Sequence, residues 1–358
     1  MTGPLDEEHS VADSRSTASP LISVVLVTFR RRFVEEAIAS VRQQTLDPGK
    51  FELIVVRNYD DPKLEDATRD AGGRSIRLDA EYFGAGTVAG VAASRGEIVT
   101  FLEDDDRFLP DKLASVLRSF QEDPSLGFYR NGFVVIDEQG RQIPDHPFRA
   151  HYRRAGERLG AVTVGGTERE TKLRQLPPLG IDFNSSCMSA RRALLQSFIA
   201  RLKLPGPRLP DELVLFSALA SPMSLRIDPG VLTEYRIHRE NISSGDARQA
   251  DPFAARHAYA RISVSSGPSL IQAVRESGDR TAIKEADGLW VIQRAYLAMR
   301  DPSTSRAEFA QLRQELARAE DSYLVRSEPR LGTALWLFSC APSLARWLYI
   351  RAIRYRSG

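Results

Sequence analysis

Four consecutive carboxylates, Glu103 to Asp106, directly follow an apolar segment at 97–102. Side chains of like charge repel one another, and two kinds of site relieve that repulsion. A hard divalent cation such as Mg²⁺ or Mn²⁺ binds carboxylate oxygens, commonly one or two from the protein with phosphate and water supplying the rest. A solvated acidic turn, in which Asp residues cap the next helix, is the other. The run by itself favours neither.

The segments around the run predict an open α/β sheet. Continuous apolar stretches at 21–29, 51–56 and 97–102 are typical of strands buried on both faces, while 33–45 and 110–120 carry the apolar stripe of amphipathic helices. Alternating strands and helices indicate a mostly parallel sheet with helices on both faces. Ligands bind such sheets beyond the carboxyl ends of the strands, which is where the acidic run lies.

The composition is that of a soluble globular protein, with 42% hydrophobic and 27% charged residues. The 49 Lys and Arg against 47 Asp and Glu leave a net charge of +2, which argues against a dedicated nucleic-acid-binding protein. Cys187 and Cys340 lack metal-type spacing and suit free thiols in a reducing compartment. No uninterrupted apolar segment approaches the ~20 residues of a membrane span. We therefore expect a cytoplasmic protein.

Composition also divides the chain into three segments. Residues 1–19 are polar and acidic without the apolar core of a signal peptide, so we expect a disordered leader. Residues 20–245 contain the alternating strands and helices, although 138–180 are rich in Gly, Pro and Arg and suggest long loops. Residues 246–358 are predicted to form an α-helical C-terminal region.

The acidic run in its surroundings resembles the metal motif of the family 2 glycosyltransferases, inverting enzymes of GT-A fold. In that family a proline follows the first acid by seven residues, as Pro110 follows Glu103 here. The resemblance extends over residues 21–245 through these segments, in order: "SVVLVTFRRRFVEEAIASVRQQTL", "FELIVV", "ASRGEIVTFLEDDD", "FNSSCMSARRALL" and "YRIHRENIS". It implies a GT-A type fold with a mostly parallel central sheet flanked by helices, followed here by a helical C-terminal extension.

The resemblance also implies a site for a nucleoside-diphosphate sugar. Residues at the ends of the first strands would contact the nucleotide: Thr28, Phe29, Arg30, Asn58, Gly84 and Asp104, the last through the ribose. Phe29 suits the nucleotide base and the hydrophobic core equally well. The glycines of "GAGTVAG" (84–90) let a helix approach the sheet and the nucleotide closely.

The metal and the base follow from the same resemblance. Asp105, with Glu103 and His238 as further candidates, would hold Mn²⁺ or Mg²⁺. Asp211, or failing it Glu212, matches the general base that takes the proton of an acceptor hydroxyl. The alternative for Asp211 is an ordinary acid at a helix N-terminus, which the helix dipole favours. His238 suits a packing role equally well.

Two departures from the family pattern affect the nucleotide site. Arg57 stands where members usually carry Asp, and an Arg cannot accept a hydrogen bond from a uracil imide. Asp60 or Asp61 are the candidates to replace that contact. Thr87-Val88 stands in place of a frequent Arg-Asn pair. Arg95 is a weak candidate to supply the lost phosphate contact, and a solvated surface Arg is its favoured interpretation. These departures keep open a non-catalytic sugar-nucleotide-binding or scaffold protein of the same fold. A nucleotidyltransferase would need a Gly-rich loop after the first strand, and "TFRRRF" is not one.

The final stretch, 331–358, places Trp and Tyr residues beside arginines. This composition suits a helix lying on an anionic membrane, and equally a helix packed on the catalytic domain or on a second subunit. Membrane contact would fit a glycan or lipid-linked acceptor in surface polysaccharide assembly. It would place the protein at the inner face of the plasma membrane.

Overall fold

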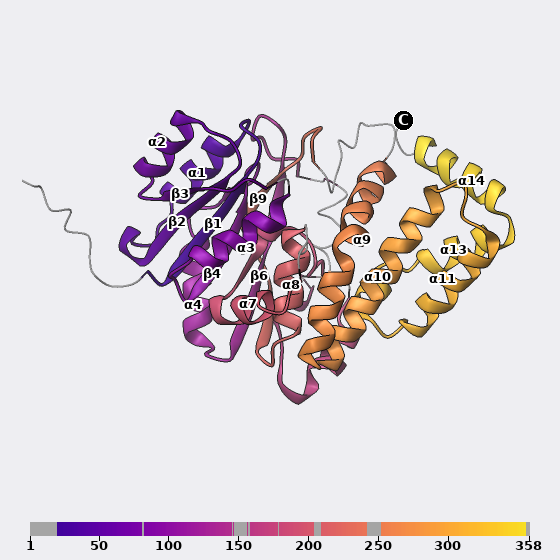
Figure 1. Ribbon diagram of the computed structural model, residues 1–358. Coiled ribbons are helices and arrows are strands. Elements are labelled where there is room, and N and C mark those ends of the chain that lie inside the picture. Colours follow the sequence, from indigo (N-terminus) through magenta and orange to yellow (C-terminus); the bar gives the residue numbers. More distant parts are fainter. Residues whose placement is uncertain are drawn as a thin grey trace, which may run out of the picture.

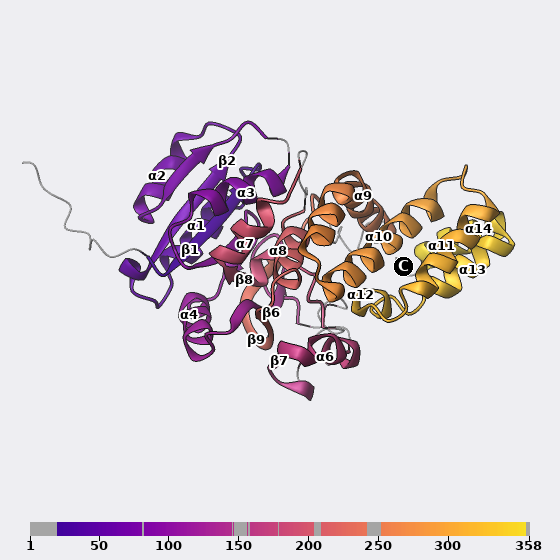
Figure 2. The ribbon, with the colours of Figure 1, turned by 60° about the horizontal axis from the view of Figure 1, so that its bottom comes forward.

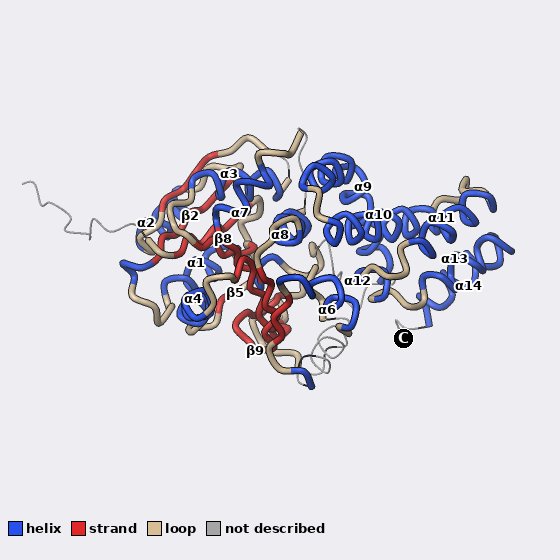
Figure 3. The backbone as a smooth tube through the Cα atoms, turned by 90° about the horizontal axis from the view of Figure 1, so that it is seen from below, coloured by secondary structure: helices blue, strands red, loops and turns tan. Residues whose placement is uncertain are grey.

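The computed structural model describes residues 20–80, 82–144, 146, 156, 158–177, 179–203, 209–241 and 252–355, with the side chains of 252–256 and 349–355 excepted. The predicted leader 1–19 and the predicted domain boundary at 245 therefore lie outside the described residues. Strands and helices form one half of the molecule, and helices alone form the other (Figure 1, Figure 3).

One nine-stranded sheet organises the first half, in the order β3-β2-β1-β4-β8-β6-β9-β5, with β7 paired to β9. Neighbours from β3 to β4 are parallel, whereas β8 runs antiparallel to β4 and β6, and β9 runs antiparallel to β5 and β7 but parallel to β6. The mostly parallel sheet expected from the sequence is thus found in the N-terminal half only, and the sheet as a whole is mixed. The strands are β1 (Ile22–Thr28), β2 (Phe51–Arg57), β3 (Arg74–Arg77), β4 (Ile98–Glu103), β5 (Arg107–Phe108), β6 (Leu126–Ile136), β7 (Val162–Val164), β8 (Met188–Arg191) and β9 (Ser224–Arg236).

Helices cover both faces of the sheet, as the alternating pattern predicts. On one face, α1 (Val34–Arg42), α2 (Pro62–Asp70) and α4 (Lys112–Glu122) pack on Val24 and Leu26 of β1. On the other, α3 (Phe83–Ala93), α7 (Arg192–Ile199) and α8 (Pro210–Leu219) share one hydrophobic core with Val25 and Val27 (Figure 2). Successive residues of a strand point to opposite faces, so the apolar run of β1 serves both cores.

Two glycines bring α3 close to the sheet. A Cβ added at Gly86 would lie 2.4 Å from Val27 Cγ1, and one at Gly90 would lie 2.3 Å from Val25 Cγ1. Contacts that short do not occur between carbon atoms, so α3 could not take this position with larger residues. The predicted role of these glycines is confirmed for the approach to the sheet.

Residues 138–180 were expected to form loops, and the described part of them contains short regular elements. These are β7, a 3₁₀ turn at Gly166–Glu168 and α6 (Arg169–Gln175). Leu173 lies in the hydrophobic core and Arg169 is the only other buried residue of α6, so the helix is too short to give a clear periodic pattern.

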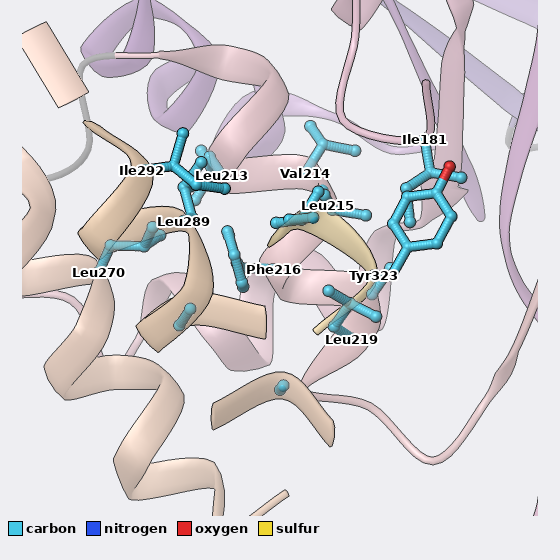
Figure 4. Close-up of a cluster of buried hydrophobic side chains, with 14 of the residues drawn as sticks. Ile181, Leu213, Val214, Leu215, Phe216, Leu219, Leu270, Leu289, Ile292 and Tyr323 are labelled. Carbon is cyan, nitrogen blue, oxygen red and sulfur yellow. The ribbon is translucent and has the colours of Figure 1, made fainter. Parts of the chain in front are cut away.

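The C-terminal helices share a hydrophobic core with the sheet half. They are α9 (Pro252–Ser277), α10 (Arg280–Arg300), α11 (Arg306–Arg318), α12 (Tyr323–Arg326), α13 (Leu331–Cys340) and α14 (Pro342–Tyr355). Leu213 and Phe216 of α8 lie with Leu270 of α9 and Leu289 of α10 in one cluster (Figure 4). Helix α8 is therefore buried between the two halves. Within the described residues, no helix is both long and apolar enough to cross a membrane.

Candidate active site

The acidic run lies at the carboxyl edge of the parallel strands. Thr28 ends β1 beside Arg57 of β2, and Val27 pairs with Glu103 at the end of β4. The chain then turns through the three Asp residues into β5, and all three Asp side chains are at least 97% buried. A solvated acidic turn is thereby excluded, because these carboxylates do not face water.

Arg30 neutralises part of the run. Its guanidinium donates to Asp104 Oδ1 and, at 2.8 Å, to Asp105 Oδ2. Asp104 also accepts a 3.3 Å hydrogen bond from the backbone N–H of Phe29. Arg30 and Asp104 were both assigned to nucleotide binding from the sequence, and the structure joins them at the end of β1.

Asp105 lies at the centre of the cluster. His238 Nε2 lies 2.8 Å from Asp105 Oδ2, while Asp105 Oδ1 is buried with no hydrogen-bond partner among the described residues. Burial favours the neutral acid, but the hydrogen bonds and charges of His238 and Arg30 prevail and lower the pKa of Asp105. An ionised, buried oxygen without a partner is what a bound cation would satisfy.

Glu103, Asp105 and Asp106 can present three carboxylate oxygens within 4.8 Å of one another. Burial, followed by the charge of Asp105, raises the pKa of Glu103 to about 8. Glu103 also accepts a 2.7 Å hydrogen bond from Ser185 Oγ. This set of oxygen ligands fits Mg²⁺ or Mn²⁺, and Asp105 with Glu103 would hold the ion.

Asp106 was not assigned a role from the sequence. Its oxygens accept from Asn184 Nδ2 at 3.0 Å and from the backbone N–H of Arg236 at 2.9 Å. It therefore ties the acidic turn to β9 and to the segment before β8. Its place in the run was visible in the sequence, but partners 78 and 130 residues away were not.

Aromatic rings lie beside the end of β1. The Phe29 and Phe83 rings are 5.0 Å apart, and the Arg30 guanidinium lies 5.5 Å from the centre of the Phe83 ring. Thr28 Oγ1 and Tyr59 Oη lie 3.1 Å apart. Tyr59 and Phe83 were missed in the sequence, because neither an aromatic residue in the loop after β2 nor one at the start of α3 carries a signal that it belongs to a site.

The other two residues predicted to contact the nucleotide, Asn58 and Gly84, also lie near this edge of the sheet. Asn58 Nδ2 donates to the Ala80 carbonyl at 3.0 Å, and Gly84 is buried in the first turn of α3. Arg57 is held by Asp60 at 2.8 Å and by Glu65. Asp60 was expected to replace the hydrogen-bond acceptor that is missing at position 57, but it is paired with Arg57 itself.

Asp61 and Arg95 are the other two residues that were considered as substitutes for missing nucleotide contacts. The Asp61 side chain caps α2 by accepting from the N–H of Lys63. Arg95 binds Glu52, which is the second residue of β2 and so lies at the amino end of the strands. Arg95 is thus at the opposite edge of the sheet with a side chain that is 65% exposed, so it is a surface Arg, as its favoured interpretation predicts, and not a phosphate contact.

Asp211 and Glu212 start α8 and are only 8% and 4% exposed. Tyr259 Oη donates to Asp211 Oδ2 at 3.3 Å, and Ser263 Oγ donates to Glu212 Oε1 at 2.6 Å. Both donors belong to α9, one helical turn apart. Both acids lie in the first turn of α8, which is also where the alternative for Asp211, an acid favoured by the helix dipole, places it.

Burial also makes these acids weak. It raises the pKa of Asp211 to about 8, with the charge of Glu212 contributing, and raises that of Glu212 to about 7. The charge of Asp211 in turn raises the pKa of Glu103, so the fold brings the two ends of the predicted site together. Asp182, absent from the sequence-based set, contributes to the raised pKa of both acids.

Known proteins share sequence and fold with this chain. Residues 23–198 match the model of glycosyl transferase family 2. An uncharacterised glycosyltransferase of Methanocaldococcus jannaschii is 25% identical over 134 residues, which are 35% of this chain and 46% of that protein. The chain thus matches a little under half the length of the curated relatives.

Two solved structures have a similar fold. S. aureus TarS in complex with UDP-GlcNAc gives a TM-score of 0.51 at 15% identity, covering 86% of this chain and 90% of that one. The mannosyltransferase PcManGT from Pyrobaculum calidifontis, in complex with GDP-Man and Mn²⁺, gives 0.50 at 15% identity, covering 95% and 86%. At these identities the likeness concerns the fold, and the predicted GT-A architecture is confirmed. The family match assigns residues 23–198, which are 176 of the 358 residues, to glycosyl transferase family 2.

Proposed function

We propose that the protein is a metal-dependent, inverting glycosyltransferase that moves a hexose from a nucleoside-diphosphate sugar to an acceptor hydroxyl. The observation that carries this proposal is the partnerless buried oxygen of Asp105 at the strand edge, together with a separate buried carboxylate, Asp211, of raised pKa. One of these groups suits a cation and the other suits a proton transfer near neutral pH.

In this proposal the donor lies across the ends of β1 and β4. Asp104 holds the ribose, Phe29 with Phe83 contacts the base, and Arg30 has the diphosphate as a second anionic partner. Mn²⁺ or Mg²⁺, held by Asp105 and Glu103, would stabilise the negative charge that develops on the leaving diphosphate. His238 orients Asp105 through the 2.8 Å contact between them.

The base acts from the opposite side. Ionised Asp211 accepts the proton of the acceptor hydroxyl as its oxygen forms a bond to the anomeric carbon. The bond from that carbon to the diphosphate oxygen breaks, and the electron pair leaves with the nucleoside diphosphate. A single displacement of this kind inverts the anomeric carbon. A carboxyl group with a pKa of about 8 is a stronger base than an ordinary Asp, which suits this step.

The neighbours of similar fold are in complex with UDP-GlcNAc in one case and GDP-Man in the other, which supports a nucleotide sugar as donor without choosing the nucleotide. We propose a glycan or lipid-linked glycan of surface polysaccharide assembly as acceptor. Such an acceptor would place the protein on the cytoplasmic side, at the inner face of the plasma membrane.

Purified protein tests the proposal. Thermal-shift screening with UDP-, GDP-, TDP- and CDP-sugars and Mn²⁺ identifies the donor, and release of nucleoside diphosphate then measures turnover. We expect turnover to require the cation and to fall at least a hundredfold in Asp105→Asn and Asp211→Asn. Asp66→Asn, which changes a carboxylate that is 66% exposed on α2, is the matched control and should retain full activity. Undiminished turnover in both site variants would refute the assignment.

A non-catalytic sugar-nucleotide-binding protein is the second candidate. It is favoured by Arg57, which occupies the nucleotide side of the site and is already paired with Asp60 and Glu65. This candidate predicts a donor-dependent rise in melting temperature with no diphosphate release for any donor and acceptor pair.

A further inference from the structure

The two last helices leave an apolar surface uncovered. Seven large hydrophobic side chains are exposed among the described residues, and five of them belong to α13 and α14. We call these five the α13–α14 face: Trp336, Leu337, Leu344, Trp347 and Leu348, of which Trp336, Leu344 and Trp347 are 49%, 56% and 52% exposed. A contiguous apolar surface on a soluble protein commonly marks an interaction site.

The opposite side of the same helices is well packed. Leu335 and Phe338 of α13 and Ala345 of α14 are buried, and the Phe338 ring lies 4.9 Å from that of Phe309 on α11. The α13–α14 face is thus the outer side of two helices that are already anchored. It lies at the far end of the molecule from β3 and α2 (Figure 1).

Positive charge accompanies this face. Residues 329–358 contain five Arg and neither Asp nor Glu. Of these, Arg346 donates to the Asp301 carbonyl at 2.6 Å and so fixes α14 against the end of α10. Exposed Trp and Leu side chains, in a segment whose sequence contains Arg and no acid, match the chemistry of an anionic bilayer.

A basic groove adjoins the same end of α10. It has a volume of about 660 Å³ and is lined by His257 and Arg261 of α9 and by Leu297, Ala298, Arg300 and Asp301. Asp301 also contacts Arg346, so the groove and the α13–α14 face are neighbours. Arg261 and Arg300 of the groove thus lie next to an apolar surface. This arrangement matches a membrane, in which the phosphate layer lies next to the acyl layer.

We propose that the α13–α14 face docks on an anionic lipid bilayer, with Trp336 and Trp347 at the interface and with Arg261 and Arg300 contacting lipid phosphates. A second copy of the chain fits this face less well, because a two-fold contact would bring Arg261 and Arg300, which adjoin the face, toward the same two residues of the other copy. Membrane docking goes beyond glycosyl transfer itself and does not depend on it. It would, however, bring a lipid-linked acceptor to the enzyme.

The groove also lies close to the candidate base. His257 and Arg261 are separated by four residues, as are Tyr259 and Ser263, and the two pairs are about 200° apart around α9 at 100° per residue. One side of α9 therefore contacts Asp211 and Glu212 while the other lines the groove. Docking would set the membrane surface one helix away from the catalytic acids.

Co-sedimentation of the full chain with vesicles tests the proposal. We expect binding to phosphatidylcholine vesicles containing about one third phosphatidylglycerol, and at least tenfold weaker binding to pure phosphatidylcholine or at 1 M salt, where charges are screened over about 3 Å. The triple variant Trp336→Ser, Leu344→Ser, Trp347→Ser should lose at least tenfold in binding. Leu159→Ser, which removes an apolar side chain that is 47% exposed elsewhere, should bind as the parent does.

A charge variant separates the groove from the apolar face. Arg261→Glu should weaken binding to anionic vesicles several-fold, whereas Arg118→Glu, an exposed Arg on α4, should not. Melting temperatures check that each variant folds. Vesicle binding equal in the parent and the triple variant would overturn the proposal. A dimer in light scattering that the triple variant converts to monomer would overturn it in favour of a second copy. Neither result involves a donor, so glycosyl transfer stands or falls separately.

Discussion

The hydrogen bond from Tyr259 to Asp211 gives the sharpest test of the proposed base. Tyr259→Phe removes one hydroxyl and keeps the ring that packs between α9 and α8. The hydroxyl donates to Asp211 Oδ2 at 3.3 Å, and a donor to a carboxylate stabilises its ionised form. The pKa of Asp211, already raised to about 8 by burial and by the charge of Glu212, should therefore rise further in the variant.

The size of the effect follows from the geometry. A hydrogen bond to a charged group contributes about 1.5–3 kcal/mol, and a contact of 3.3 Å belongs at the weak end of that range. Since one pKa unit corresponds to about 1.36 kcal/mol, we expect a rise of about one unit. At pH 7 the ionised fraction of the base would fall from about one tenth to about one hundredth, and kcat/KM would fall about tenfold. Because the base is almost fully ionised at high pH in both proteins, the two rates should converge by about pH 10.

The assay is release of nucleoside diphosphate from the donor found by thermal shift, measured from pH 6 to 10. Ser263→Ala is the control, because its hydroxyl binds Glu212 and not Asp211. Losing that bond raises the pKa of Glu212, keeps Glu212 neutral to higher pH and should leave the acidic limb in place or move it to lower pH. If Tyr259→Phe lowered kcat/KM by the same factor at every pH, the reasoning would be refuted, because the hydroxyl would then not change the pKa of the base.

Two further predictions concern stability. Without a divalent cation, the melting temperature should fall as pH rises from about 5 to 8, because Glu103 and Asp211 have pKa values near 8 when folded and ordinary acid values when unfolded, so the folded state binds more protons across that window. Asp211→Asn should flatten this slope, and Mn²⁺ should raise the melting temperature more at pH 8 than at pH 5; a melting temperature independent of pH and metal would contradict both pKa shifts. Gly86→Ala should destabilise the fold by about 1–3 kcal/mol in chemical denaturation, because the new Cβ would lie 2.4 Å from Val27 Cγ1. Gly332→Ala is its control, since the nearest atom would be 3.9 Å away and the gain in helix propensity should leave stability equal or up to about 1 kcal/mol higher; equal effects of the two substitutions would show that close packing of α3 does not matter.

Much of the fold follows from local pattern. The strands β1, β2 and β4 were predicted within a residue or two, because a strand buried on both faces leaves a continuous apolar run. Their parallel pairing was predicted as well, since helices join them. The antiparallel pairing of β8 and the position of β9 beside β6 were not predicted, because the partners of these strands are distant in the sequence and nothing within the strands specifies them.

The candidate site also combines residues that were predicted from the sequence with residues that only the structure reveals. Glu103 to Asp105 were expected at the strand edge, and Asp211 was expected opposite them from the family resemblance. Tyr259 and Ser263, which hold the two acids of α8, come 48 and 51 residues later on a helix whose sequence shows only an ordinary helical pattern. Arg95 was considered for a phosphate contact because it lies close to β4 in the sequence. The structure places it at the amino end of the strands, away from the candidate site.

By itself the sequence determined which residues form strands and helices around the edge and which kinds of side chain end them, because apolar periodicity and the acidic run are local properties. The tertiary structure alone decided which carboxylates are buried, which are paired and which oxygen of Asp105 is left without a partner. It also decided which side of α13 and α14 faces outward. These properties depend on contacts between segments far apart in the chain, and no local pattern encodes the distance between two such segments.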